Sequence, residues 1–198
     1  MKPITLLFGL LLIPTLVSAQ LDLVGKNIFI EGTFDVFGDS RLKPIGWNFP
    51  NEDDSPWKAG FRATVVKGET GHKELLLVSP DSNGYVGASA RLPLPAKLQH
   101  IRVSYRVFAK SLELGVANPA GNGAGVYLRF LDKSGRSMRE LGWVASMVQA
   151  SAAEWQEREQ IFDVPAEADS LAFEVILRSA KGEVRFDDIK VVPVATNP

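Results

Sequence analysis

Apolar and polar residues alternate with a period of two along most of the chain. The clearest example is the segment 99–109, which has an apolar row of Ile101, Val103, Tyr105 and Val107. The row between them is polar and consists of His100, Arg102, Ser104 and Arg106. Because successive side chains of a strand point to opposite faces, the pattern predicts a strand with one row in a core and the other in water. The segments 126–131 and 171–178 alternate in the same way.

Shorter stretches with this pattern predict further strands at 27–31, 61–67, 74–79, 85–92, 141–148, 156–164 and 183–192. Clusters of turn-forming residues separate them, at 68–71, 80–84, 93–95, 132–135 and 180–182. Only 146–155 could hold a helical turn, and its Ala and Ser content suits a loop equally well. About ten short strands with almost no helical periodicity predict an all-β antiparallel β-sandwich.

Two long segments lack any regular pattern, 38–60 and 112–124. Loops longer than about 12 residues in a compact domain are commonly functional. No internal repeat or linker divides the chain, so a single domain is expected.

Residues 1–19 have the pattern of an export signal. Lys2 supplies a positive start, the segment 4–17 is mostly apolar, and Val17-Ser18-Ala19 offers the small residues that signal peptidase recognises. We expect cleavage before Gln20 and a secreted or periplasmic domain over 20–198. The apolar stretch is shorter than the roughly 20 residues of a membrane-spanning helix, so no membrane insertion is expected after cleavage. An uncleaved anchor is the alternative.

Charge and cysteine content narrow the possible functions. The chain has 22 Lys and Arg against 23 Asp and Glu, and its formal net charge of −1 argues against a general nucleic-acid binder. It has no cysteine, which excludes disulfides, thiol catalysis and Cys-ligated zinc. It has two histidines, His72 and His100, which excludes a zinc site with three histidines.

Motifs of the common enzyme classes are missing. The chain has no Gly-x-Ser-x-Gly, no Walker loop and no His-Glu-x-x-His. The glycine-rich segment 121–125 lacks the spacing of a phosphate loop and precedes a predicted strand. We therefore expect no catalysis. Two alternatives stay open: a pair of carboxylates for glycoside hydrolysis, or a polysaccharide lyase built on His100, Tyr127 and Arg102.

Five short motifs, in order along the chain, resemble those of galactose-binding-like carbohydrate-binding modules. They are Glu-Gly-Thr-Phe-Asp at 31–35 with Pro-Ile-Gly-Trp at 44–47, Asp-Lys-Ser-Gly at 132–135, Trp155 with Phe-Asp-Val-Pro at 162–165, and Val-Arg-Phe-Asp-Asp-Ile at 184–189. The likeness spans 27–194. It implies a jelly-roll sandwich whose first and last strands lie side by side.

The resemblance also implies a structural calcium ion. Carried over by position, its ligands are Asp35 and Asp187, completed by backbone carbonyls in 67–73. Calcium takes six to eight oxygen ligands and tolerates such irregular sets. The alternative is that Asp35 caps a turn and Asp187 is a solvated strand residue.

Aromatic residues are the main candidates for sugar binding, because the C–H faces of a pyranose stack on flat rings. Trp47 and Trp155 occupy structural positions in the resembling modules, and Tyr105 lies in an apolar row. The remaining candidates are Trp57, Tyr85, Tyr127 and Trp143.

The polar row of 99–109 is basic. If Tyr127 and Arg129 came from a neighbouring strand, this row would form a cationic sheet face that bears an aromatic ring, suited to uronic acids. The alternative is that its arginines keep the face soluble and pair with Glu174.

The sequence thus predicts an exported, non-catalytic carbohydrate-binding protein that recognises a polysaccharide or glycan. The predicted binding residues are Arg102, Tyr127, Arg129, Trp143, Trp57 and Tyr85. An extracellular protein-interaction or adhesion domain is the main alternative, and a jelly-roll lyase or glycoside hydrolase is a further one.

Overall fold

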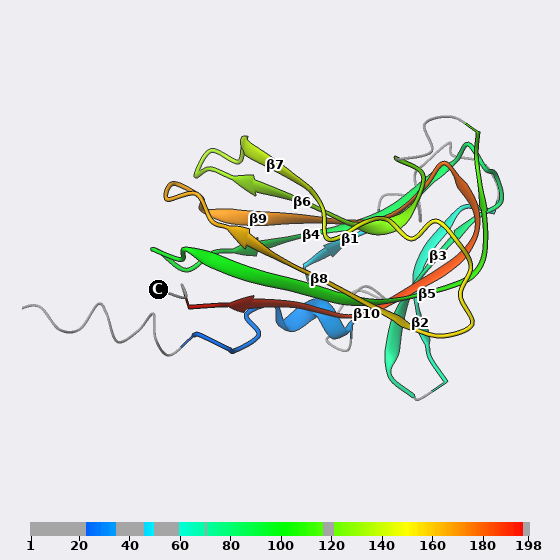
Figure 1. Cartoon of the computed structure of the whole chain (residues 1–198), viewed down its shortest axis with the longest axis horizontal. Helices are drawn as coiled ribbons and strands as arrows, with labels where there is room; N and C mark the ends of the chain where they lie inside the picture. Colours follow the sequence, from blue (N-terminus) through cyan, green and yellow to red (C-terminus); the bar gives the residue numbers. More distant parts are fainter. Residues whose placement is uncertain (1–22, 35–45, 50–59, 70, 117–120, 196–198) are drawn as a thin grey trace, which may run out of the picture.

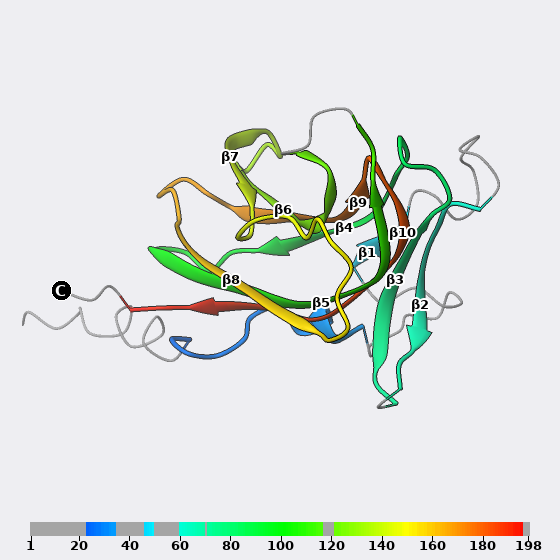
Figure 2. The same cartoon turned by 45° about the vertical axis from the view of Figure 1, so that its right-hand side comes forward.

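The computed structural model describes residues 23–34, 46–49, 60–69, 71–116 and 121–195, which form two five-stranded antiparallel sheets packed face to face (Figure 1; Figure 2). Sheet I has the order β1 (Trp47–Asn48), β4 (Tyr85–Pro93), β9 (Ser170–Arg178), β6 (Gly123–Leu131) and β7 (Ser137–Trp143). Sheet II has the order β2 (Arg62–Lys67), β3 (Lys73–Ser79), β10 (Ala180–Pro193), β5 (His100–Leu114) and β8 (Gln156–Asp163). The predicted all-β jelly-roll sandwich is confirmed.

No helix in the described part of the chain is long and apolar enough to cross a membrane. The predicted export signal at 1–19 lies outside the described residues. The described segments build one sandwich, and its two sheets share one core.

The strongest alternating segments form the central strands. The apolar row of β5 is 0–1% exposed, whereas its polar row is half-buried or exposed. This strand is longer than predicted, because β10 pairs with it as far as Leu114. The segment 112–124 was predicted to be irregular, but its first residues belong to β5 and its last residues belong to β6, which begins at Gly123. This corrects the prediction at both ends of the segment.

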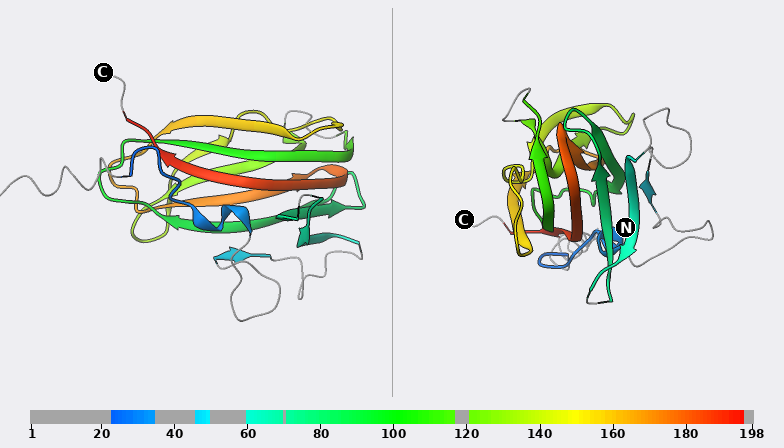
Figure 3. Two further views of the ribbon diagram at one scale, coloured as in Figure 1. Left: turned by 90° about the horizontal axis from the view of Figure 1, so that it is seen from below. Right: turned by 90° about the vertical axis from the view of Figure 1, so that its right-hand side faces the viewer.

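The predicted strand at 27–31 does not form. A 3₁₀ turn, η1 (Ile30–Thr33), occupies this position, and the chain before it lies along β10 (Figure 3). The Ile28 amide donates to the Val191 carbonyl at 2.8 Å, but the Val191 amide donates to the Asn27 side chain at 2.9 Å. A side chain therefore takes the hydrogen bond that a strand carbonyl would accept. The first segment lies beside the last strand, as the resemblance implied, without becoming a strand.

The strand predicted at 141–148 begins and ends earlier, as β7. Gly142 and Ala145 have φ values of 82° and 56°, which turn the chain out of the strand direction. Beyond the turn, Val144 and Val148 are buried and bond to the backbone of β6. The segment 146–155 is a loop and holds no helical turn.

The core lies between the inward rows of the two sheets. Its largest fully buried side chains are Tyr105, Phe34, Phe130, Phe173, Phe186, Leu75, Leu77, Ile101, Leu128, Leu171, Leu177 and Ile189. Trp47 is buried against Phe34 with ring centroids 5.0 Å apart, so its predicted structural role is confirmed. Because the inward rows are filled, the side chains of these strands that a ligand can reach are those of the outward faces.

Candidate functional site

Four of the six predicted binding residues lie on one surface, the outward face of sheet I. Tyr85 belongs to β4, Tyr127 and Arg129 to β6, and Trp143 to β7. Their neighbours in sequence point into the core, so strand alternation places all four outside. We call this surface the aromatic face. Trp57 lies outside the described residues.

The floor of the aromatic face is a row of small residues around one large one. Gly87 of β4 and Gly125 of β6 flank Ile176 of β9 in the antiparallel register. A Cβ atom on Gly125 would lie 3.3 Å from the Trp143 indole, and one on Gly87 would lie 3.5 Å from the Tyr85 hydroxyl. Gly125 therefore leaves room for the Trp143 ring, whereas Gly87 is required by the Val175 carbonyl oxygen, which would lie 2.7 Å from its Cβ. Ile176 is only 4% exposed although it points outward.

The next row carries the remaining ring. Tyr127 directly faces Glu174 on one side and Trp143 on the other. The Tyr127 and Trp143 rings meet edge to face, with centroids 5.2 Å apart and planes at 71°. This is a favoured geometry for aromatic pairs, and it fixes both rings. Tyr85 is 47% exposed and directly faces Arg178, on the strand that carries Glu174.

An ion pair lies at the centre of the aromatic face, between Arg129 and Glu174. The pKa of the Tyr85 hydroxyl is raised above its ordinary value, mainly by burial and next by the Glu174 charge, although Arg129 and Arg178 oppose the shift. The phenol therefore stays protonated at neutral pH and can donate a hydrogen bond. Arg178 forms no ion pair with any described residue.

A shallow pocket of about 280 Å³ adjoins this ion pair. Asn48, Ser89 and Arg91 line it together with Arg129 and Glu174. These side chains offer amide, hydroxyl, guanidinium and carboxylate groups, which suit the hydroxyl groups of a sugar. The aromatic face thus combines apolar rings with a polar pocket.

Sequence reasoning missed several of these residues. Glu174 lies in the polar row of a strand that the alternation predicted, but it was interpreted only as a partner for the arginines of 99–109. Asn48 belongs to β1, inside the segment 38–60 that was predicted to be irregular. Only the sheet order brings the two residues to one surface.

The predicted cationic face around Arg102 does not form. The neighbours of β5 are β10 and β8, so Tyr127 and Arg129 lie on the other sheet. Acidic residues accompany the basic row instead: His100 bonds to Asp163 at 2.9 Å, and Arg106 lies 3.9 Å from Asp187. The alternative pairing with Glu174 is also wrong, since sheet I carries that residue.

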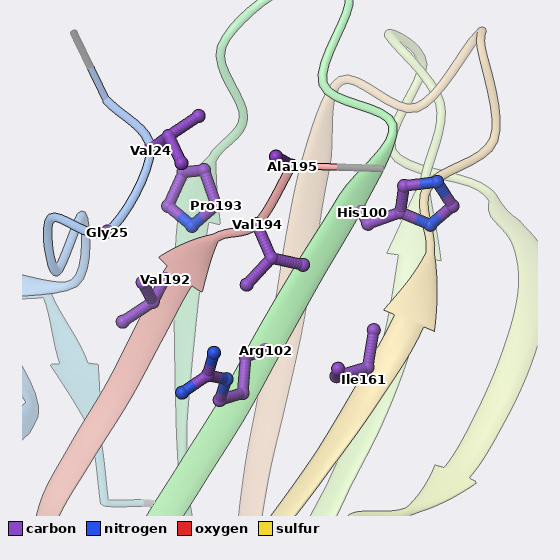
Figure 4. A pocket seen from close by; sticks show the side chains of 9 residues that line it. All are labelled: Val24, Gly25, His100, Arg102, Ile161, Val192, Pro193, Val194 and Ala195. Atoms are coloured by element: carbon purple, nitrogen blue, oxygen red, sulfur yellow. The ribbon is translucent and has the colours of Figure 1, made fainter. Parts of the chain in front are cut away.

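The same sheet order separates the residues of the predicted lyase site. His100 and Arg102 point outward from sheet II, whereas Tyr127 points outward from sheet I, and the core lies between them. These three side chains cannot meet in one cleft. Arg102 lines a separate pocket on sheet II (Figure 4).

Trp155 lies on the outward side of sheet II, where it packs against the outward side chains of β5. Its ring contacts Phe108 with centroids 5.8 Å apart, and the Arg106 guanidinium lies 4.9 Å from its ring centre. This packing agrees with the structural role predicted for Trp155.

Asp187 occupies a bulge of β10, where its register against β5 shifts. Burial raises the pKa of this carboxyl, and the charges of Asp188 and Glu74 raise it further, while the Asp188 amide and Arg106 oppose the shift. A hard cation would stabilise a half-buried carboxylate in such surroundings. The described residues contain no group of three metal-ligating side chains, and Asp35 lies outside them.

Comparisons with known proteins bear on the fold. No protein-family model and no curated protein matches the chain. The enzymatically active domain of tailspike protein 4 from bacteriophage CBA120 is similar, with a TM-score of 0.61, 10% identity and coverage of 85% of this chain and 21% of that chain. The CBM22-1–GH10 modules of xylanase 10B from Clostridium thermocellum, complexed with xylohexaose, are also similar. Their TM-score is 0.51 at 16% identity, and the match covers 77% of this chain and 27% of that chain.

A tandem CBM22-1–CBM22-2 domain from Paenibacillus barcinonensis Xyn10C gives a TM-score of 0.50 at 16% identity and covers 79% of this chain and 44% of that one. The chain therefore spans less than half of each of these similar structures. At such identities the similarity concerns the fold. The protein has the β-sandwich fold of carbohydrate-binding modules, as its sequence motifs predicted.

Proposed function

We propose that this protein is an exported, non-catalytic carbohydrate-binding protein whose site is the aromatic face. The observation that carries the proposal is the meeting of Tyr85, Tyr127 and Trp143 on one outward face around Glu174. Sugar rings would stack on the aromatic side chains, and the Arg129–Glu174 pair and Asn48 would bond to their hydroxyl groups.

The fold suits this form of recognition because β4, β9, β6 and β7 carry the binding groups on hydrogen-bonded strands. Rings held by close packing lose little conformational freedom when a ligand binds. Exposed hydroxyl groups gain little net free energy on leaving water, so we expect modest affinity for each sugar unit. A polysaccharide that extends across several strands would add such contributions.

The charge of the aromatic face favours glycans that carry carboxylates. Of its three described arginines, Arg129 pairs with Glu174 and Arg91 lies 3.9 Å from Asp169, whereas Arg178 has no ion pair among the described residues. Arginine binds carboxylates through two parallel hydrogen bonds. We therefore include polysaccharides with uronic acids among the proposed ligands.

The proposal assigns no catalytic role to this face. Glycoside hydrolysis uses two carboxyl groups, one on each side of the scissile bond. The described carboxylates at this face are engaged by arginines, Glu174 by Arg129 and Asp169 by Arg91.

Exchange of Trp143 tests the proposal. On a glycan array and by calorimetry with the best ligand, Trp143→Ala should weaken binding at least tenfold, about 1.4 kcal/mol. Trp155→Ala is the matched control, because it removes the same side chain from the other sheet and should leave affinity unchanged. Equal losses in both variants, or an array that shows no glycan, would reject the site; capture of a protein ligand instead would indicate an interaction domain.

A structural calcium ion forms the second part of the proposal. Asp187 would hold it together with Asp35 and backbone carbonyls of 67–73, and the ion would neutralise carboxylates at the bulge of β10. The raised pKa of the half-buried Asp187 beside Asp188 and Glu74 supports this assignment. The ion would tie the first segment of the domain to its last strand.

A further inference from the structure

The outward face of sheet II carries an open pocket with a volume of about 780 Å³, which we call the Arg102 pocket. It lies where β5, β8 and β10 adjoin the first described segment (Figure 4). Its lining is mostly aliphatic and includes Val24, Ile161, Val192, Pro193 and Val194.

Two apolar residues of the lining expose their side chains to solvent. Ile161 is 57% exposed and Val24 is 39% exposed, and they are two of the five large hydrophobic side chains that are exposed among the described residues. Single exposed apolar residues are common on protein surfaces, but several in one hollow indicate a binding surface.

Arg102 differs from His100 and Arg106, the other basic residues of the same outward row. In the register, His100 faces Asp163, and Arg106 faces Glu157 and Asp187. Arg102 faces Ile161 on one side and Val192 on the other. It forms no ion pair with any described residue, and Figure 4 shows its side chain extending toward Val192. The pocket therefore combines one unpaired guanidinium and aliphatic walls with the His100 ring, which is bonded to Asp163 at 2.9 Å.

We propose that the Arg102 pocket binds a monomeric aliphatic carboxylate. The guanidinium would hold the carboxylate through two parallel hydrogen bonds, which are stronger than bonds between neutral groups. The aliphatic chain would cover Ile161, Val192 and Val24, and removal of this apolar surface from water would favour binding. A single unpaired positive charge suits a head group with one negative charge.

This site is independent of the aromatic face, because it lies on the opposite sheet. Glycan binding and carboxylate binding can therefore be measured separately on the same protein. A variant that loses one should retain the other, so the failure of one proposal leaves the other intact.

The probe is dodecanoate below its micelle concentration, followed by calorimetry and by NMR shifts of the intact protein. We expect shifts confined to the Arg102 pocket. Affinity should rise from octanoate through decanoate to dodecanoate, up to about fourfold for each fully buried methylene. Dodecyltrimethylammonium, which has the same chain and the opposite charge, should bind at least tenfold more weakly.

Arg102→Gln should weaken dodecanoate binding about tenfold or more, and Ile161→Ser should flatten the dependence on chain length. Arg62→Gln is the matched control, since Arg62 is an exposed arginine on β2 of the same sheet without an ion pair among the described residues. Equal binding of the cationic amphiphile, shifts outside the pocket or no dodecanoate binding would overturn the proposal. Binding to anionic vesicles without binding of free dodecanoate would overturn it as well.

Discussion

Glu174 of β9 and Arg129 of β6 form an ion pair diagonally across two neighbouring strands, because Glu174 directly faces Tyr127 and Arg129 directly faces Ala172. Both side chains are partly exposed, so solvent screens the pair and its contribution to stability is small, about 1 kcal/mol or less. Its larger effect is electrostatic, because the Glu174 charge also acts on the hydroxyl of Tyr85.

Glu174→Gln should lower the pKa of Tyr85. The substitution removes a negative charge that raises this pKa, while the opposing charges of Arg129 and Arg178 remain. The titration can be followed by NMR of the tyrosine rings. Glu183→Gln, on sheet II, is the control and should leave the value unchanged. A Tyr85 pKa that stays constant or rises in Glu174→Gln would contradict the arrangement of the face.

Gly125→Ala should weaken glycan binding without a large loss of stability. The added Cβ lies 3.3 Å from the Trp143 indole, which must move by a few tenths of an ångström. The measurements are affinity, Trp fluorescence and thermal midpoint. Gly87→Ala is the contrasting variant, because its Cβ would lie 2.7 Å from the Val175 carbonyl oxygen, a backbone atom. It should cost roughly 1–3 kcal/mol of stability. An unstable Gly125→Ala with normal affinity would disprove this distinction.

The buried Tyr105 should make the protein sensitive to alkali. Burial raises its pKa to about 12, from 10.0, although Arg158 and the Val126 amide oppose the shift. The folded state therefore holds this proton more tightly than the unfolded state. Stability from this group is complete below pH 10 and falls as the pH rises, by roughly 2 kcal/mol at pH 12.

Tyr105→Phe isolates this effect. The Tyr105 hydroxyl donates only a long hydrogen bond of 3.4 Å to the Val144 carbonyl, so the variant should fold with a small loss at pH 8. The difference in denaturant stability between wild type and Tyr105→Phe should shift in favour of the variant between pH 10 and 12. A constant difference across this range would show that Tyr105 titrates alike in both states.

Removal of the proposed calcium ion should lower the thermal midpoint. A melt with a chelator, then with excess Ca²⁺, gives the comparison, and Mg²⁺ is the control because it prefers a tighter octahedral site. Asp187→Asn should lose the response to Ca²⁺. An unchanged midpoint in wild type would reject the calcium site and leave the glycan proposal untouched.

Arg178→Gln should reduce the preference for carboxylated glycans. Arg178 has no ion pair among the described residues and lies close enough to Tyr85 to affect its pKa. Affinity for a uronic-acid polysaccharide should fall severalfold and become less sensitive to salt, while affinity for a neutral glycan stays constant. Equal losses of affinity for the two glycans would show that Arg178 maintains the shape of the site and does not bind the carboxylates.

Alternation along single strands was the reliable part of the sequence reasoning. The rows of 99–109, 126–131 and 171–178 are inward and outward as predicted, because burial of one face forces a period of two. Edge strands were less predictable. β7 begins with Ser-Met-Arg-Glu at 137–140, which lacks a sustained alternation of apolar and polar residues, so its start was missed.

The sheet order could not be read from local pattern. β5 and β6 are consecutive, yet the chain crosses from one sheet to the other between them. For this reason Tyr127 and Arg129 lie on the same sheet face as Tyr85 and Trp143, whereas Arg102 lies on the other sheet. The 3₁₀ turn at Ile30–Thr33 was missed for a different reason, since the hydrogen bond from Val191 to the Asn27 side chain depends on a contact distant in sequence.

The strands of the aromatic face serve two purposes through opposite rows of side chains. In β4, β6 and β9 one row fills the core and the other row carries the proposed site. Apart from Gly87 and Ile176, which are closely packed, residues of the outward row can therefore be substituted with little penalty in folding. A lineage of such proteins could exchange its preferred glycan repeatedly while the inward rows stay nearly constant, and sequence drift in this scaffold should concentrate at alternate positions.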